Sequence, residues 1–425
     1  MNILLLCHSF PFPPTSGDKI RSYNIIQHLA ANHRVTVATV VRNQQQVVLA
    51  TVERHNIRML VGRVWDPLQT LRMIGRLPTA VPSSFGFFYS SRLKNLIDDL
   101  LRREHFDLIF VHCSSVARYV EHVDGVPKIL DFADMDSQKW LDYGQHHRLP
   151  VSLGYRLEGI KLEREERRLA RLFQMCTVVT PAEFETLDAY QAASLADWFP
   201  NGVDCEYFSP AEEPYDANMM VFVGKMNYFP NEQCMIEFCH DTFPVIRAEL
   251  PDARLVIVGT SPTRAVRALS SQTGVTVTGA VDDVRPYLRR AAVAIAPLKV
   301  ARGTQNKVLE AMAMGIPVVA SPLAARGVDA VPGEHLLVGA TAEQFAQAIL
   351  KVMRNGDVRR TLAERGRQRM LSHHTWDHAM RRLDEVVART FDAHNSGSPD
   401  VAQEIIAPAE RSTRNGANAS VVRLP

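Results

Sequence analysis

The sequence has 425 residues, of which 46% are hydrophobic and 22% are charged. This balance is typical of a folded protein with sizeable cores, and the length favours two domains. Lys and Arg number 48 against 46 acidic residues, a net charge of +2, so the clustered basic excess of a nucleic-acid-binding protein is missing. No stretch approaches the roughly 18 consecutive apolar residues that cross a membrane.

Six cysteines are scattered along the chain without a CxxC pair. The closest two, Cys234 and Cys239, have no neighbouring His or Cys that would complete a zinc set in the sequence. Scattered thiols of this kind are typical of a reducing compartment. The sequence therefore predicts a cytoplasmic protein with free thiols and no metal site.

The first half alternates apolar runs with amphipathic stretches. The segment Met1-Asn-Ile-Leu-Leu-Leu-Cys7 lacks a basic region and leads directly into a proline-rich loop, so we interpret it as a first buried strand and not as a signal peptide. Further strands are expected at 34–41, 57–61, 107–112, 128–131 and 177–180, with helices at 19–31 and 155–173. Alternation of this kind predicts a parallel sheet covered on both faces.

The second half repeats the pattern. Strands are expected at 219–224, 254–259, 275–279, 292–297 and 317–321, with helices at 231–249 and 305–314. The predicted fold class is α/β, with two doubly wound Rossmann-like domains facing each other across a cleft. The expected parts are a first Rossmann-like domain (1–205), a second Rossmann-like domain (206–372), a helix returning to the first domain (373–391) and a disordered tail (392–425).

The segment from Pro297 to Ala320 carries the clearest chemical signal. It has the pattern strand, glycine-containing loop, helix, glycine, strand, with the helix expected to begin near Thr304. Free backbone N–H groups and the helix dipole make such a start a binding site for a diphosphate. Lys307 lies in the first turn, where a cation opposes the dipole unless an anion binds. Glu310 shares its face, and its carboxylate is suited to accept both hydroxyls of a ribose.

Three segments then point to one family. Leu309-Glu-Ala-Met-Ala-Met-Gly-Ile-Pro-Val-Val-Ala320 resembles the signature of glycosyltransferase family 4, whose members are retaining enzymes of the GT-B fold. The segments 200–210 and 221–225 resemble the interdomain segment and the first strand and basic loop of the second domain of that family. The sequence also resembles that of a bacterial subgroup tied to exopolysaccharide assembly, in Gly17-Asp18 and in the segments 130–137 and 228–231.

The resemblance implies a metal-independent hexosyltransferase that moves a sugar from a nucleoside-diphosphate sugar to a saccharide or lipid-linked acceptor, with no cofactor. It assigns Glu310 to the donor ribose, Lys225 and Lys307 to the diphosphate, and His112 to the donor sugar beside the reacting centre. The candidate catalytic residues are therefore His112, Lys225, Lys307 and Glu310. The candidate donor-binding residues are Gly17, Gly224, Lys225, Arg302, Gly303, Thr304, Lys307 and Glu310.

One position departs from the family. Arg302 stands where the family has a second Glu that contacts the sugar, and a guanidinium has no acceptor for a sugar hydroxyl. We expect Arg302 either to add positive charge at the phosphates or to pair with an acid across the cleft. The departure keeps a non-catalytic nucleotide-sugar sensor open as an alternative, together with a nucleotide-sugar epimerase.

Two other features allow different interpretations. Asp134-Met-Asp136 is a DxD motif, which holds a metal and the donor diphosphate in the other glycosyltransferase architecture, but so short a motif arises readily by chance. Between Arg63 and Arg103, seven basic residues face three acids around Phe85-Gly-Phe-Phe-Tyr89. Such a segment suits peripheral contact with an anionic membrane at its inner face, although the aromatic residues would equally serve as an inward-packing helical insertion.

Overall fold

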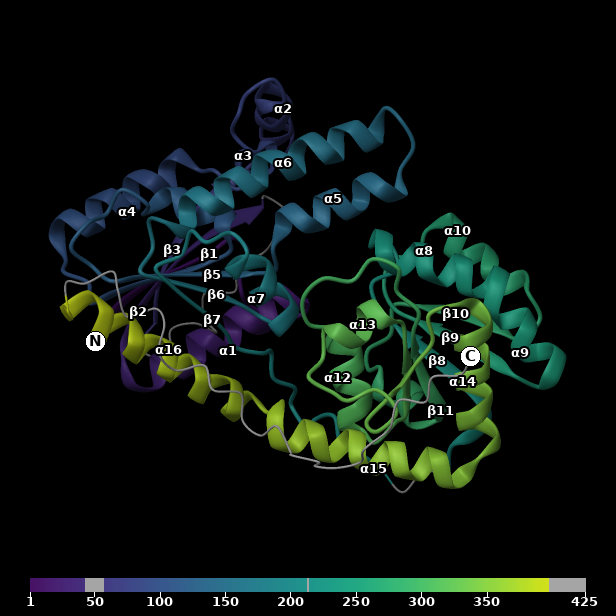
Figure 1. Ribbon diagram of the computed structural model, residues 1–425. Coiled ribbons are helices and arrows are strands. Elements are labelled where there is room, and N and C mark those ends of the chain that lie inside the picture. The colour runs from purple at the N-terminus through teal and green to yellow at the C-terminus, as the bar shows by residue number, and fades with distance from the viewer. Residues whose placement is uncertain (43–56, 212–213, 397–425) are drawn as a thin grey trace, which may run out of the picture.

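The computed structural model describes residues 1–42, 57–211 and 214–396, which form two α/β domains joined by a short connection and by a long C-terminal helix (Figure 1). The helix expected at 373–391 continues as α16 (Trp376–Ser396) beyond Phe391. The rest of the predicted tail lies outside the described residues. None of the described helices is long and apolar enough to cross a bilayer.

In the first domain all described strands run parallel, in the order β3-β2-β1-β4-β5-β6-β7. Six of them lie near their predicted positions, while the seventh was not predicted because it is only half-buried. The strands are β1 (Asn2–Cys7), β2 (Arg34–Arg42), β3 (Ile57–Val64), β4 (Leu108–His112), β5 (Lys128–Ala133), β6 (Met175–Val178) and β7 (Leu195–Trp198).

Helices cover both faces of this sheet because successive strand residues point to opposite sides. In β1, Ile3 and Leu5 pack against α1 and α16, whereas Leu4 and Leu6 pack on the side of α4, α6 and α7. The helices of the first domain are α1 (Gly17–Asn32), α2 (Asp66–Arg76), α3 (Ser83–Phe87), α4 (Ser91–Arg103), α5 (Asp136–His146), α6 (Val151–Ala170) and α7 (Pro181–Asp188).

The second domain contains a parallel sheet in the order β10-β9-β8-β11-β12-β13 among the described residues. Its strands are β8 (Asp216–Val223), β9 (Arg254–Val258), β10 (Val275–Gly279), β11 (Ala291–Ala296), β12 (Val318–Ala320) and β13 (Leu337–Val338). Its helices are α8 (Phe229–Glu237), α9 (Phe243–Glu249), α10 (Arg264–Ala268), α11 (Arg285–Arg289), α12 (Asn306–Ala313), α13 (Pro322–Arg326), α14 (Ala342–Arg354) and α15 (Gly356–His373).

The helix predicted at 231–249 is interrupted. A π-helical turn spans Phe238–Thr242 between α8 and α9, and Pro244 occupies the first turn of α9. Proline has no N–H to donate to the preceding turn, and such a gap in the ladder is where a helix widens or bends. The predicted helical segment is confirmed, and the π-helical turn divides it into α8 and α9.

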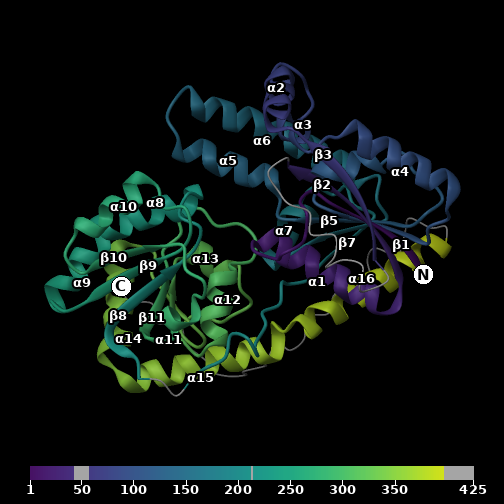
Figure 2. The same ribbon diagram turned by 180° about the vertical axis from the view of Figure 1, so that it is seen from behind.

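The chain crosses between the domains twice, and the two crossings touch. The backbone N–H of Val203 donates to the carbonyl of His374 at 2.7 Å, and a Cβ on Gly202 would lie 2.6 Å from the backbone of Trp376. From there α16 runs back along the first domain, where Ala379, Met380 and Leu383 enter its core. Figure 2 shows α15 and α16 lying along one edge of both domains.

Each sheet reverses its strand order at one place, between β1 and β4 in the first domain and between β8 and β11 in the second. In open parallel sheets, ligands bind beyond the carboxyl ends of the strands at this reversal. His112 ends β4, Lys225 lies just beyond β8, and Arg302 follows β11. The fold therefore places the predicted site residues at both reversal points.

Candidate active site

The loop after β11 leads into α12, which begins at Asn306, slightly later than predicted. Gln305, the residue before the helix, provides no side-chain cap, so the first N–H groups of α12 are open to an anion. The Thr304 hydroxyl is buried and has no hydrogen-bond partner among the described residues. Gly303 has φ +61°, and a Cβ there would lie 1.7 Å from Asp134 Oδ1. Glycine is therefore required at 303 by both its conformation and this contact.

The two predicted lysines are linked through one asparagine. Lys307 Nζ donates to Asn231 Oδ1 at 2.6 Å, and Asn231 Nδ2 donates to the carbonyl oxygen of Lys225 at 3.0 Å. A Cβ on Gly224 would lie 2.8 Å from Asn231 Nδ2, so Gly224 leaves room for this bridge. The Lys225 side chain is exposed and has no polar partner among the described residues. The end of β8 and the start of α12 thus bring together the unpaired Lys225 and the fixed Lys307.

Burial acts on the charges of Lys307 and Glu310. Desolvation lowers the pKa of Lys307 to about 8, although the charges of Cys234 and Glu310 act to raise it. Desolvation raises the pKa of Glu310 to about 7, although the charge of Lys307 acts in the opposite direction. Lys307 Nζ also lies 4.5 Å from the centre of the Phe222 ring. Both groups therefore titrate close to neutral pH, which is common where charges are held for a ligand.

The starts of two helices from different domains meet at this place. Gly17 is the first residue of α1, and a Cβ on it would lie 3.4 Å from Asn306 Nδ2 at the start of α12. Asn306 Oδ1 also faces Asn201 Nδ2 at 3.4 Å in the interdomain connection. Two helix starts carry positive partial charge toward the same region. The structure thereby brings Gly17 from the first domain to the start of α12 in the second.

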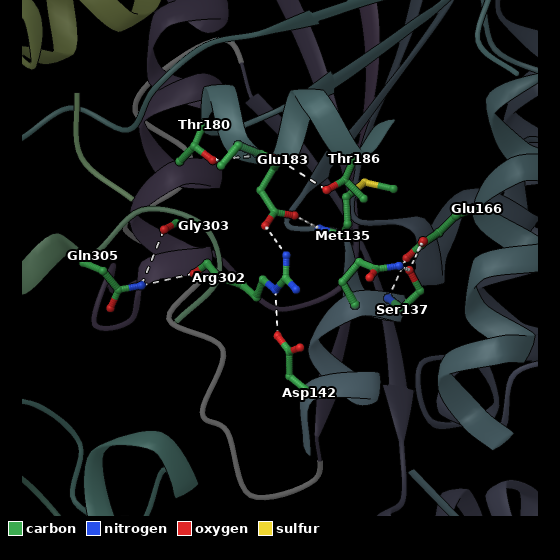
Figure 3. A network of polar contacts seen from close by, with 12 residues as sticks. Met135, Ser137, Asp142, Glu166, Thr180, Glu183, Thr186, Arg302, Gly303 and Gln305 are labelled. Atoms are coloured by element: carbon green, nitrogen blue, oxygen red, sulfur yellow. Dashed lines mark hydrogen bonds and ion pairs between the residues drawn. The ribbon is translucent and has the colours of Figure 1, made fainter. Parts of the chain in front are cut away.

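Arg302 pairs with acids of the first domain. Its Nε lies 2.8 Å from Asp142 Oδ2 on α5, and its Nη1 lies 3.7 Å from Glu183 Oε1 on α7 (Figure 3). Glu183 also accepts the backbone N–H of Met135 at 2.6 Å, and burial raises its pKa to about 7. Of the two arrangements considered for Arg302, the structure contains the ion pair across the domains.

His112 lies in a buried polar network. It is 1% exposed, its Nδ1 lies 2.8 Å from Asp131 Oδ2, and its Nε2 is buried without a partner among the described residues. Arg21 of α1 binds Asp131 through Nε and Nη2, both at 2.9 Å. Arg21 Nη1 then donates to Asn201 Oδ1 at 3.0 Å. The Asp131 carboxylate thus fixes the orientation of His112.

Sequence reasoning missed Asp131, Arg21 and Asn231 as parts of the site. Asp131 was visible as an acid between the apolar residues Leu130 and Phe132 of β5, and Arg21 as one cation on the apolar face of α1. Such isolated charges are costly to bury unless they are paired. Asn231 gave no comparable signal, because asparagine is common in loops and at helix starts.

The comparisons with known proteins concern the second domain and the fold. Residues 217–355 match the family model described as glycosyl transferases group 1. The matched segment contains Gly224, Lys225, Arg302, Gly303, Thr304, Lys307 and Glu310, whereas Gly17 and His112 lie outside it. No curated protein matches the sequence.

Solved structures match over nearly the whole chain. Sucrose-phosphate synthase from Thermosynechococcus elongatus is 17% identical, with 92% of this chain and 99% of that chain covered and a TM-score of 0.68. Anabaena HepE in complex with UDP is 13% identical, with 92% and 100% covered and a TM-score of 0.66. A glycosyltransferase from Rickettsia africae is 13% identical, with 92% and 98% covered and a TM-score of 0.62. The fold is therefore GT-B.

Proposed function

We propose that the protein is a retaining, metal-independent glycosyltransferase that uses a nucleoside-diphosphate sugar. The main support is the meeting of Gly17 and Asn306, which directs the starts of α1 and α12 to the region held by Lys307. Two helix starts and two lysines suit a diphosphate, and Glu310 on the same helix suits a ribose. HepE, which shares the fold, was solved with UDP and with UDP-glucose.

The charges indicate how the site would act. Breaking the bond between the anomeric carbon and the diphosphate leaves negative charge on the leaving group and positive charge on the sugar. Lys225, Lys307 and the start of α12 would stabilise the leaving group, an electrostatic contribution that is often the largest in catalysis. In the proposed retaining reaction, the acceptor hydroxyl attacks the face from which the diphosphate leaves, and a phosphate oxygen takes its proton. His112 Nε2 is available for a hydroxyl of the donor sugar.

The function is tested by incubating the pure protein with UDP-, GDP- and ADP-sugars and a saccharide or lipid-linked acceptor, with EDTA present. Transfer releases a free nucleoside diphosphate, an epimerase yields a new sugar nucleotide, and a sensor shows binding alone. Loss of transfer in EDTA would contradict the metal-independent reaction and favour Asp134 and Asp136 as metal ligands. Because the sequence resembles the exopolysaccharide subgroup, we propose that the acceptor is an intermediate of exopolysaccharide assembly. The transfer would take place in the cytoplasm.

We predict that Glu310→Gln weakens donor binding by about 10- to 100-fold, the effect of losing a charged hydrogen-bond acceptor worth about 1.5–3 kcal/mol. In the unaltered protein, affinity should rise with pH through about 7, because the ionised carboxylate accepts the ribose hydroxyls and the protonated group does so less well. The variant should lack this rise. Titration calorimetry from pH 6 to 7.5 measures both effects.

Glu364→Gln is the matched control, since Glu364 is exposed on α15. It should leave the affinity and the pH profile unchanged. A Glu310→Gln profile that still rises through pH 7 would assign the titration to another group.

The structure favours a different surface for the proposed membrane contact than the aromatic segment 85–89. Phe85 is 2% exposed and Phe88 packs against the first-domain core, so these aromatic residues face inward. The neighbouring helix α2 instead exposes Leu71 at 65% and Ile74 at 52%, with Trp65 just before it at 56%. A tryptophan and an apolar helix face beside basic residues suit an anionic lipid surface.

We predict that the protein sediments with vesicles containing anionic lipid, and that Leu71→Ser with Ile74→Ser lowers this binding at least tenfold. Each buried aliphatic side chain contributes roughly 1.5–3 kcal/mol when it leaves water fully. Leu323→Ser, on an exposed position of the second domain, is the control. Equal sedimentation of the double variant and the control would exclude the α2 face.

A further inference from the structure

A second group of side chains lies at the strand reversal of the first domain. Cys7 of β1 and His112 of β4 are register partners on adjacent parallel strands, so the residues that follow them, His8 and Cys113, leave the sheet side by side. One ligand atom from each of His8, His112 and Cys113 lies within 4.8 Å of the other two. His8 lies far in the sequence from the consecutive pair His112 and Cys113, which explains why no cysteine or histidine spacing predicted this group.

Both histidines have a carboxylate on one side and an unused nitrogen on the other. His112 Nδ1 lies 2.8 Å from Asp131 Oδ2, and His8 Nε2 lies 3.5 Å from Asp18 Oδ2. The remaining nitrogens, His112 Nε2 and His8 Nδ1, are buried and have no hydrogen-bond partner among the described residues. A buried polar atom without a partner is costly, so its retention needs an explanation.

This arrangement is the one that metal-binding histidines adopt. A ligating histidine directs its other ring nitrogen to a carboxylate, which fixes the ring and makes the ligating nitrogen more basic. Asp131 is itself held by Arg21, and Asp18 accepts hydrogen bonds from Ser9 and Ser16, each at 2.6 Å. Both carboxylates are thus fixed before any ion binds.

Cys113 supplies a ligand of a different kind. Its φ of 76° is unusual for a residue other than glycine, and strained backbone of this type is concentrated at functional sites. Burial raises the pKa of its thiol well above the ordinary value, and the nearby negative charges act in the same direction, from Asp136, Asp131, Asp18 and Asp134. A negative field of this kind attracts a divalent cation.

We propose that His8, His112 and Cys113 form a binding site for Zn²⁺, with two imidazole nitrogens and one thiolate as ligands and a fourth position left open. Nitrogen and sulfur ligands in this number suit zinc better than magnesium or calcium, which prefer oxygen. On binding, the thiol proton of Cys113 is released to solvent as the sulfur–zinc bond forms.

The site has a consequence that rests on the proposed function. The metal would occupy His112 Nε2, which is the nitrogen available to the donor sugar. Zinc should therefore inhibit sugar transfer in competition with the donor, while EDTA leaves transfer intact. Inhibition and binding are separate readouts, so a failed transfer assay would not decide whether the metal site exists.

Binding is tested on the full chain by titration calorimetry with Zn²⁺ and by the thiolate-to-metal absorption band of added Co²⁺. We expect one Zn²⁺ per chain, an affinity at least tenfold weaker in His8→Gln and Cys113→Ser, and no cobalt–thiolate band in Cys113→Ser. Asp18→Asn removes a carboxylate behind a ligand and should weaken binding by about 10- to 100-fold. Cys205→Ser, at a partly exposed cysteine of the interdomain segment, should bind as the unaltered protein does.

Two results would overturn the proposal. Absence of Zn²⁺ binding by the unaltered protein would mean that the free nitrogens serve a substrate hydroxyl alone. Equal Zn²⁺ binding by the unaltered protein, His8→Gln and Cys113→Ser would place the ion elsewhere on the chain. Thermal unfolding of each variant without metal establishes that the folded state is retained.

Discussion

Lys307→Ala is expected to lower turnover by about 10²-fold or more at saturating donor. Lys307 is held in place by Asn231 at 2.6 Å and lies in the first turn of α12, so its charge is fixed before the diphosphate arrives. Losing one such preorganised contact to a developing negative charge typically costs about 10²–10³ in turnover. Initial rates of nucleoside-diphosphate release, measured over a range of donor concentrations, separate turnover from binding.

Lys299→Ala is the matched control. Lys299 lies in the same loop system, but it is 60% exposed and pairs with Glu237 at 2.8 Å. Such an exposed pair contributes little, so this variant should turn over at nearly the normal rate. A Lys307→Ala protein that folds normally and turns over within threefold of the control would remove Lys307 from the reaction.

Regular elements were predictable from the sequence where apolar runs are long and fully buried. The strands β1, β4 and β11 are buried along their length and stand out as Val-, Ile-, Leu- or Ala-rich runs. The strands β7 and β13 were missed, since they are short and only half-buried and so carry no distinct pattern. Apolar patterning thus gave the fold class and missed the short strand at one edge of each sheet.

The candidate site was predictable only where one segment carries it. Lys307 and Glu310 share a helix, so their spacing alone placed them on one face. Contacts between distant segments left no such trace. An ion pair of Arg302 across the cleft was one of two expected arrangements, but its partner Asp142 could not be named from the sequence. Asp134 meets Gly303 through backbone shape, which no residue pattern encodes. The DxD motif was visible in the sequence, but the sequence did not indicate where it lies. In the structure its first residue, Asp134, packs against Gly303.

Asp131→Asn is expected to lower the free energy of unfolding by about 3–5 kcal/mol, because it leaves the buried Arg21 guanidinium without its counter-charge. Asp131 is 0% exposed and Arg21 is 1% exposed, and they share two bonds of 2.9 Å. Denaturant titration at pH 7 is the measurement.

The Arg21 and His112 side chains hold the pKa of the Asp131 carboxyl well below its ordinary value. A depressed carboxyl pKa stabilises the fold above the ordinary pKa, and this stabilisation is lost as the pH falls through the folded-state value, so it is fully present at pH 7.

Thr177→Val shows how much stability a neutral hydrogen bond to Asp131 contributes, for comparison with the ion pair. Thr177 carries no charge and donates a single hydrogen bond of 3.0 Å to Asp131. Its loss should cost about 0.5–1.5 kcal/mol. A value for Asp131→Asn no larger than that of Thr177→Val would mean that the ion pair adds nothing beyond a neutral hydrogen bond.

The double variant Arg21→Met with Asp131→Leu separates stability from function. Replacing both members of a buried ion pair with apolar residues is often neutral, so much of the lost stability should return. Sugar transfer should stay low, because His112 Nδ1 would lose the carboxylate at 2.8 Å that orients its ring. Recovery of both properties would show that Asp131 supports the fold alone, whereas recovery of stability alone assigns it the positioning of His112.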